Sequence, residues 1–470
     1  MLIWFVMLYL LISISISISI GIGLYAATRV HSAKDYVVAG RSLPLYIVIA
    51  TVFATWFGSE TVLGTSATFL QNGLKGIFVD PFGASLCLVL VGVFFARKLY
   101  RMNLLTIGDY YRLRYGRTVE LLTSIAIVIS YLGWVTAQIT ALGLVFSLLT
   151  HGAVSAHAGM VIGAAIVLAY TLFGGMWSVA LTDFFQIIII VAGMLYIGWV
   201  ISNQVGGVAT VVNHAQAAGK FQFWPALQSR DVLAFIAAWV TMMFDSIPQQ
   251  DVFQRVMSAK NETTAVTGAV LGGTLYFSFA FIPIFLAYSA TLIDPASVKA
   301  LIANDPQHIL PDLILNHTPV FAQVMFFGAL LSAIMSTASG TLLAPSVTFT
   351  ENILKPFIGH LSDRHLLLAM RAVVVVFTGI VTLYALNANA SIYHMVENAY
   401  KVTLVAAFVP LLFGLYWKRA STQGALFAIV LGVSSWLLLE IFLPDGLWPP
   451  PAVRLADESG GDAGGVVALS

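Results

Sequence analysis

The chain has 470 residues, of which 59% are hydrophobic and only 9% are charged, and its mean hydropathy is +0.92. This composition predicts a polytopic membrane protein. A formal net charge of +1 argues against an acidic or nucleic-acid partner, and a single cysteine, Cys87, excludes a disulfide within the chain.

Twelve apolar segments, each near the length that a bilayer requires, predict about twelve transmembrane helices. They are residues 3–25, 45–71, 77–97, 119–149, 155–174, 181–202, 231–252, 266–291, 319–350, 365–387, 393–416 and 424–443. The Ser-Ile alternation in the first segment has the period of a strand, but a lone strand in lipid would leave its backbone unpaired. That segment is therefore also predicted to be a helix.

Lysine and arginine side chains are distributed unevenly between the two sides of the predicted membrane. Sixteen of the 22 fall on one side, in the connections 26–44 and 98–118 and in shorter stretches such as the one around Arg255. The positive-inside rule therefore places the 26–44 loop in the cytoplasm and the N-terminus outside the cell membrane. On the outer side, the polar loops 203–230 and 292–318 are predicted to be lids or short surface helices.

Two of the segments contain irregular stretches that predict broken helices. Segment 45–71 is interrupted around Gly58. Segment 231–252 is interrupted around Asp245–Pro248. The two breaks are five spans apart, and because five is odd the two halves would lie in opposite orientations, as in many secondary transporters. The alternative for the proline is a kink that neighbouring helices support.

A row of hydroxyl groups lies within the segment 319–350. Ala333, Ser336 and Thr337 stand at i, i+3 and i+4, so they share one face of a helix. A carbonyl and two hydroxyls on one face could hold a small hard cation if another carbonyl were freed nearby. The alternative is structural, because such hydroxyls also bond to carbonyls of their own helix or to a neighbouring helix.

Four separated stretches resemble signature segments of the sodium:solute symporter family. They are Ala54–Gly64, Tyr170–Gln186, Ile247–Val256 and Ala329–Gly340, and their order and spacing also fit that family. Within the family, the chain is most similar to the high-affinity choline transporter branch. The resemblance implies an all-α fold with a leucine-transporter-type 5+5 inverted repeat, broken helices, and import of a small organic solute driven by Na+.

On this basis the chain divides into four regions. Residues 1–44 form the first transmembrane helix and a cytoplasmic loop, 45–416 the inverted-repeat transport core, and 417–443 the last transmembrane helix. Residues 444–470, which are rich in proline, glycine, aspartate and alanine, are predicted to be a disordered tail.

The resemblance carries a main sodium site over to five positions. They are the carbonyls of Ala54, Phe57 and Ala333 and the hydroxyls of Ser336 and Thr337. A monovalent hard cation needs several neutral oxygens at close range, and a helix break exposes carbonyls that an intact helix would occupy. Na+ is therefore the expected coupling ion.

A second sodium ion is predicted at Asp183, with Ser336 and Ser339 completing its shell. An ionisable group inside a span is costly and usually functional. Members that resemble the sialic acid transporters have a further hydroxyl where this chain has Gly340. The alternative is that Asp183 is an acid at a helix start, stabilised by the helix dipole and by nearby backbone N–H groups.

The solute is expected beside the first sodium ion, between the second, third, seventh and eleventh spans. The candidate binding residues are Trp56, Glu60, Thr61, Asp80, Trp134, Asp245 and Gln249. Aromatic faces combined with carboxylates suit an organic cation. The choline branch has a tryptophan where this chain has Gln249 and small residues where it has Asp245, which favours a primary amine, an amino acid or a polyamine over choline. Packing of the tryptophans and pairing of the acids are the structural alternatives.

An enzyme and a solute sensor are the other classes of function for a membrane protein of this kind. The sequence has no G-x-S-x-G, H-E-x-x-H or G-x-x-x-x-G-K motif, so no enzymatic activity is expected. A Na+-coupled sugar or carboxylate symporter stays open, as does a solute sensor on the same fold, although nothing after Leu443 resembles a kinase. The expected partners are a small-molecule solute, Na+ and the lipid bilayer, without nucleic acid.

Overall fold

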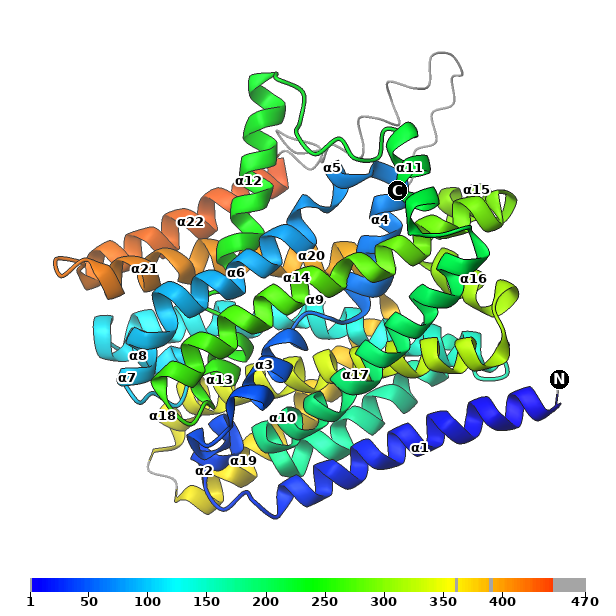
Figure 1. The fold of residues 1–470 in the computed structure, drawn as a ribbon. Helices are drawn as coiled ribbons and strands as arrows, with labels where there is room; N and C mark the ends of the chain where they lie inside the picture. The colour runs from blue at the N-terminus through cyan, green and yellow to red at the C-terminus, as the bar shows by residue number, and fades with distance from the viewer. Residues whose placement is uncertain (1, 360–361, 389–391, 443–470) are drawn as a thin grey trace.

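The computed structural model describes residues 2–359, 362–388 and 392–442, and almost all of them are helical (Figure 1). Helices occupy each of the segments predicted from the sequence. Seven of the described helices are long and apolar enough to cross a membrane, and one bent pair makes an eighth span. The predicted tail, residues 444–470, lies outside the described residues.

The first half of the chain contains the elements α1 to α11. Their bounds are α1 Leu2–Ala27, α2 Ala33–Val38, η1 Ala39–Arg41, α3 Leu45–Phe53, η2 Glu60–Thr65, α4 Ser66–Asn72, α5 Leu74–Ile77, η3 Phe78–Gly83, α6 Ala84–Leu90, η4 Val91–Ala96, α7 Arg97–Arg101, α8 Ile107–Tyr115, α9 Arg117–Leu149, α10 Ala156–Gln204 and α11 Val208–Ala217.

The second half contains the elements α12 to α22. Their bounds are α12 Ser229–Asp245, α13 Gln250–Met257, α14 Glu262–Ile293, α15 Pro295–Asn304, η5 Pro306–His308, α16 Ile309–His317, α17 Val320–Thr348, η6 Phe349–Leu354, α18 Lys355–Ile358, α19 Asp363–Asn387, α20 Ile392–Thr403, η7 Leu404–Phe408, α21 Val409–Tyr416 and α22 Thr422–Phe442.

The most buried long helix is α17, which carries the hydroxyl row and is buried along nearly its whole length. Figure 1 shows α9, α10 and α17 in the middle of the molecule, with α1 and α22 at opposite edges. Large apolar side chains are exposed on the outward faces of several helices, for example Trp199 of α10, Val376 of α19 and Leu431 of α22. Such an apolar outer surface on long helices fits the hydrocarbon core of a bilayer.

The helix α10 has 49 residues and is interrupted at Gly175, where φ is 51° and ψ is −136°. This backbone conformation favours glycine, and a Cβ at this position would also overlap with the carbonyl and ring of Tyr36. An unbroken helix of this length would measure about 74 Å, far more than the roughly 30 Å hydrocarbon core. The interruption at Gly175 falls between the two predicted spans 155–174 and 181–202.

Both predicted helix breaks are present. The first lies between α3 and η2, where Ala54–Gly58 forms a turn. The second separates α12 from α13, whose axes are bent by 47°. Glycine in one break and Pro248 in the other interrupt the regular backbone hydrogen bonding, as expected.

The two polar loops predicted on one side of the membrane also contain short helices, namely α11, α15 and α16. Asp294 caps α15 by accepting a hydrogen bond from the Ser297 N–H at 3.0 Å, and it contacts His317 Nε2 at 3.1 Å. The Ser297 hydrogen bond, with a smaller contribution from His317, lowers the pKa of Asp294. These contacts join the start of α15 to the end of α16.

Candidate functional site

The first helix break lies directly against the hydroxyl row of α17. The Thr337 hydroxyl donates a hydrogen bond to the Ala54 carbonyl across a distance of 3.3 Å. A Cβ on Gly58 would lie 2.6 Å from Thr337 Oγ1 and 3.0 Å from Gln138 Oε1, so only glycine allows this approach. The structure thus brings together two of the residues predicted for the main sodium site.

The other three residues predicted for that site are buried in the same region. Phe57 follows Ala54 in the turn, and Ala333 and Ser336 lie on α17. The Ser336 hydroxyl donates to Asp183 Oδ1 at 2.5 Å, so it faces α10. The carbonyl and hydroxyl oxygens of these residues are neutral, and neutral oxygens are the donors that suit Na+.

Asp183 and Ser336, predicted for the second sodium ion, also meet, but Ser339 turns away. The Ser339 hydroxyl donates to the Ser336 carbonyl of its own helix at 2.9 Å. The second oxygen of Asp183 accepts a hydrogen bond of 2.5 Å from Thr51 Oγ1. Asp183 is therefore part of a contact between α3, α10 and α17.

A buried arginine adjoins this contact, which the sequence did not predict. Arg255 was placed in a connection near a span end, but its side chain is fully buried on α13. Its Nη2 lies 3.8 Å from Asp183 Oδ2, and its Nη1 lies 3.6 Å from Asp251 Oδ2. Tyr131 of α9 in turn donates to Asp251 Oδ1 at 2.5 Å. The predicted position was wrong because these two carboxylates and their neighbours draw the arginine inward.

Glu60, one of the predicted solute contacts, is held by side chains of α9. Trp134 Nε1 donates to Glu60 Oε1 at 3.2 Å, and Gln138 Nε2 donates to Glu60 Oε2 at 2.7 Å. Gln138 Oε1 also accepts from the Ser59 hydroxyl at 3.0 Å. Gln138, which the sequence analysis missed, thereby fixes the residues that follow the first break.

Asp80 is held by hydroxyl groups. Thr65 Oγ1 donates to Asp80 Oδ2 at 2.8 Å, and the Tyr276 hydroxyl of α14 donates to Asp80 Oδ1. Thr61 Oγ1 lies 2.8 Å from the Tyr276 hydroxyl and donates to the Trp56 carbonyl at 2.9 Å. Tyr276 was also missed, and a polar aromatic side chain in the middle of an apolar span was the signal that could have found it.

Three aromatic rings lie close together at the first break. The ring centroid of Trp56 is 6.5 Å from that of Trp134 and 6.3 Å from that of Tyr276. The Tyr131 ring stacks on Trp134 at 6.0 Å. Such a group of aromatic faces can attract an organic cation.

At the second break, several carboxylate and amide atoms have no hydrogen-bond partner among the described residues, whereas the first break has such an atom in Trp56 Nε1. Those at the second break are Asp245 Oδ1, Gln249 Oε1 and Gln250 Nε2, and all three side chains are fully buried. The other oxygen of Asp245 accepts from the adjacent Ser246 hydroxyl at 3.0 Å. Buried polar groups normally have partners, so atoms of this kind mark a place where a ligand or water can bind.

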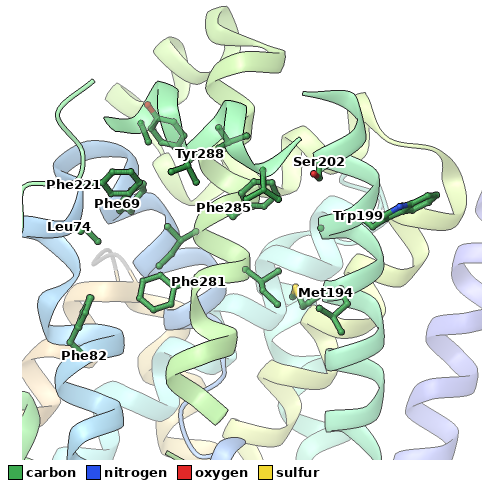
Figure 2. A pocket seen from close by; sticks show the side chains of 18 residues that line it. Phe69, Leu74, Phe82, Met194, Trp199, Ser202, Phe221, Phe281, Phe285 and Tyr288 are labelled. Carbon is green, nitrogen blue, oxygen red and sulfur yellow. The ribbon is translucent and has the colours of Figure 1, made fainter. Parts of the chain in front are cut away.

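A separate apolar cavity of about 690 Å³ lies between α4, η3, α10, α11 and α14 (Figure 2). Phe82, Met194, Phe281 and Phe285 are among its lining residues. As far as the structure describes the chain, its lining includes none of the residues predicted for the ion or the solute. An apolar lining of this kind does not suit a charged solute.

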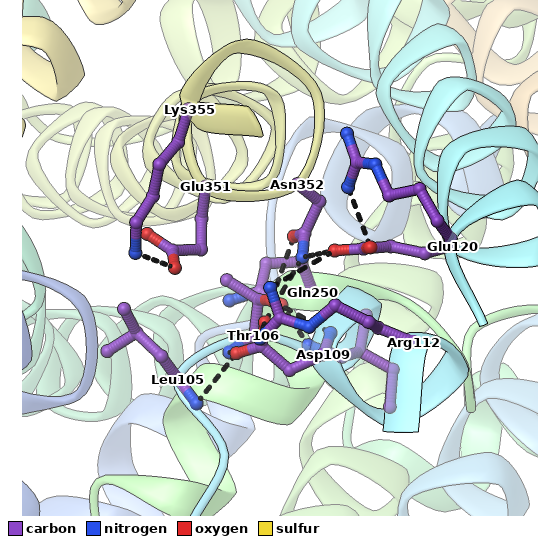
Figure 3. Close-up of polar contacts among 11 residues, drawn as sticks. Leu105, Thr106, Asp109, Arg112, Glu120, Gln250, Glu351, Asn352 and Lys355 are labelled. Carbon is purple, nitrogen blue, oxygen red and sulfur yellow. Dashed lines mark hydrogen bonds and ion pairs between the residues drawn. The ribbon is translucent and has the colours of Figure 1, made fainter. Parts of the chain in front are cut away.

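A polar cluster joins α8, α9, α13 and η6 (Figure 3). Asn352 donates to Glu120 Oε1 at 2.8 Å and accepts from Thr106 Oγ1 at 2.8 Å. Gln250 of α13 accepts from the Ile107 N–H, at the start of α8, at 2.8 Å. This cluster fixes the N-terminal end of α13, which directly follows the second break.

Comparison with known proteins gives the family. The family model described as "Sodium:solute symporter family" matches residues 36–432. The chain belongs to the sodium:solute symporter family. This symporter is therefore a sodium-linked transport protein of the membrane, in agreement with its apolar helices.

Among similar proteins, the human high affinity choline transporter 1 is 29% identical over 440 residues, covering 88% of this symporter and 73% of the relative. The osmoregulated proline transporter OpuE of Bacillus subtilis is 27% identical over 439 residues, covering 88% of this chain and 85% of the relative. A structure of a Na+-coupled sialic acid symporter superposes with a TM-score of 0.81 at 20% identity, covering 96% of each chain. At that identity the structural likeness shows the fold.

Proposed function

We propose that this protein is a Na+-coupled secondary symporter that imports a small organic solute carrying an amine. The observation that carries the proposal is the buried carboxylate oxygen of Asp245, which has no partner among the described residues. Burying an unpaired charge is expensive. An ammonium group would supply both the opposite charge and the hydrogen-bond donors that this oxygen needs.

Gln249 supports the same assignment. Its Oε1 atom is also buried without a partner in the described part of the chain, and it lies on the same helix break as Asp245. An acceptor-only carboxylate and an amide oxygen together favour a solute with several N–H donors. A primary amine, an amino acid or a polyamine offers these donors, whereas a quaternary ammonium offers none.

The aromatic group formed by Trp56, Trp134 and Tyr276 supports a cationic solute independently. The ring centroids of Tyr276 and Trp134 lie 6.3 and 6.5 Å from that of Trp56. The electron-rich ring faces would stabilise a positive charge by about 0.5–2 kcal/mol. Glu60, Thr61 and Asp80 would shape this side of the site through the hydrogen bonds that hold them.

The coupling ion in this proposal is a sodium ion at the first break, bound by the carbonyls of Ala54, Phe57 and Ala333 and the hydroxyls of Ser336 and Thr337. The contact of 3.3 Å between the Thr337 hydroxyl and the Ala54 carbonyl supports it. Since both breaks would be stabilised in one conformation by their ligands, Na+ and the solute would bind cooperatively.

The same proposal includes the membrane arrangement predicted from the sequence. The symporter would have twelve spans, with the spans between the first and the last forming a 5+5 inverted repeat around the two breaks. The N-terminus would lie outside and the 26–44 loop in the cytoplasm. Cysteine accessibility on either side of intact cells tests this topology.

The alternative functions are a Na+-coupled sugar or carboxylate symporter and a solute sensor. Uptake into proteoliposomes that contain the purified protein distinguishes them. We expect a radiolabelled amine, amino acid or polyamine to accumulate above its equilibrium level only with an inward Na+ gradient. Stronger competition by a neutral sugar or a simple carboxylate would contradict the amine assignment, and solute binding without uptake would identify a sensor.

A further inference from the structure

Arg255, Asp183 and Asp251 are three charged side chains that lie together, completely buried, beside the hydroxyl row. The Nε of Arg255 donates to Thr51 Oγ1 at 3.2 Å, and its two Nη atoms lie 3.8 and 3.6 Å from Asp183 and Asp251. The same Asp183 was predicted to bind a second sodium ion. The guanidinium and that ion would therefore compete for one carboxylate.

The backbone of α17 is shaped to admit this guanidinium. A Cβ on Gly340 would overlap with Nη1, Nη2 and Cζ of Arg255. Glycine at this position lets the side chain reach Asp183, and any larger residue would force it to move.

The donors around Asp183 do not fit a second sodium ion while Arg255 is in place. Ser336 and Thr51 both donate their hydroxyl protons to Asp183, each across 2.5 Å. Ser339 donates to its own helix. A sodium ion needs several free oxygens, and it would also lie next to a guanidinium of the same charge, which repels it.

The charges of this cluster agree with a single sodium ion. Asp183 and Asp251 together carry −2 and Arg255 carries +1, so the cluster has a net charge of −1. One Na+ at the main site adds +1, and the ligands proposed for that site are neutral. Ser336, a proposed ligand of that ion, also bonds to Asp183, so this hydroxyl would link the ion to the cluster. A second Na+ would give the group formed by Asp183, Asp251, Arg255 and the main-site ion a net positive charge, which is unfavourable.

We propose that Arg255 is a tethered cation that takes the place of a second sodium ion at Asp183, so that each transport cycle uses the main sodium ion alone. The part that concerns the transport cycle rests on the proposed function. The pairing of Arg255 with Asp183 does not depend on it.

The pairing is tested first, by thermal unfolding of the full-length purified protein in Na+-free buffer. Arg255→Gln, which leaves two buried carboxylates without a cation, should lower the melting temperature more than Asp183→Asn does. Combining Asp183→Asn with Arg255→Gln should restore part of the loss. Purely additive shifts would overturn the pairing, whether or not the protein transports Na+.

The ion count is tested by equilibrium binding of ²²Na+ to the same protein. The wild type should bind a single ion with a hyperbolic dependence on Na+ concentration. Gly340→Ser, which displaces the guanidinium and adds an oxygen near Asp183, should bind a second ion, and Asp183→Asn in that background should remove it. Gly328→Ser is the matched control, since a Cβ on Gly328 of the same helix meets nothing within 4 Å.

Two bound ions in the wild type, reduced to one by Asp183→Asn alone, would overturn the tethered-cation proposal. A single ion whose binding survives Thr337→Ala would instead contradict the main sodium site of the proposed function. The two failures are therefore distinguishable, and Gly340→Ser keeps the test decisive if Arg255→Gln does not fold.

Discussion

The two helix breaks differ in how their buried side-chain acceptors are satisfied. At the first break, the carboxylate of Glu60 is bound by Trp134 and Gln138, and that of Asp80 by threonine and tyrosine hydroxyls. At the second break, Asp245 and Gln249 each keep a buried oxygen without a partner among the described residues. Both breaks are equally enclosed by protein, so burial does not account for the difference.

This difference suggests two roles: the acids at the first break stabilise its structure, and those at the second break bind a ligand. In the proposed function, acids whose oxygens are already bonded hold the first break in shape, and its backbone carbonyls would bind the ion. The second break keeps unused acceptors, which a ligand can satisfy, and such groups are retained at functional sites despite their cost in stability. The four predictions below test this division, beginning with the largest expected effect.

Removing the Thr337 hydroxyl should have the largest effect, because it contacts the freed Ala54 carbonyl directly. We expect Thr337→Ala to raise the Na+ concentration for half-maximal uptake by about 10- to 150-fold, because a polar contact with a charged group is worth about 1.5–3 kcal/mol. The control is Thr341→Ala, since Thr341 Oγ1 bonds only to carbonyls of its own helix. Unchanged Na+ dependence in Thr337→Ala would place the ion elsewhere.

Neutralising Asp245 should weaken solute binding without unfolding the protein. Loss of a buried charge partner costs at least about 2 kcal/mol, so Asp245→Asn should raise the KM of an amine solute by about thirtyfold or more. Asp80→Asn is the matched comparison. Because Asp80 already accepts from several hydroxyls, its KM effect should be much smaller. Equal effects of the two substitutions would remove the distinction between the breaks.

Glu60→Gln should reduce stability rather than solute affinity. Each oxygen of Glu60 accepts one hydrogen bond, from Trp134 or from Gln138, but a glutamine amide has only one oxygen. One of the two donors would therefore be left unsatisfied, and an unsatisfied buried donor costs about 1–3 kcal/mol. Thermal unfolding of Glu60→Gln, of Trp134→Phe and of the double variant should give non-additive shifts. A large rise in KM at unchanged melting temperature would instead make Glu60 a solute ligand.

The smallest effect is expected at the polar cluster of Figure 3. Gln250→Ala removes the acceptor of the Ile107 N–H and should cost about 1 kcal/mol of stability. Hydrogen exchange at the start of α8 should then become faster while exchange in the middle of α9 is unchanged. No change at α8 would show that Gln250 does not hold this helix.

The breaks themselves could be predicted from the sequence because glycine and proline interrupt apolar runs at Gly58 and Pro248. The proximity of Ala54 to Thr337 came from the family resemblance, since no local pattern joins residues 283 positions apart. Seven described helices, or eight with the bent pair α12 and α13, are long and apolar enough to cross a membrane, and the predicted number of twelve spans stays a prediction.

Arg255 could not be found in this way. An arginine near a span end usually extends its charge to the interface. The local i,i+4 pair with Asp251 was a signal in the sequence, but the approach of Asp183 from α10 arises only in the folded chain. Gln138 and Tyr276 were missed for a related reason. A polar side chain inside a span has a common structural explanation, and its role depends on which acid it meets.

The most direct test of the central claim is Na+-driven uptake by wild type and Asp245→Asn in proteoliposomes, measured over one panel of amines, amino acids, sugars and carboxylates. We expect the wild type to accumulate an amine-bearing solute with an inward Na+ gradient, and Asp245→Asn to lose affinity for it while keeping the Na+ dependence. Preferred uptake of a solute without an amine, with normal transport by Asp245→Asn, would contradict the assignment of the second break as the solute site.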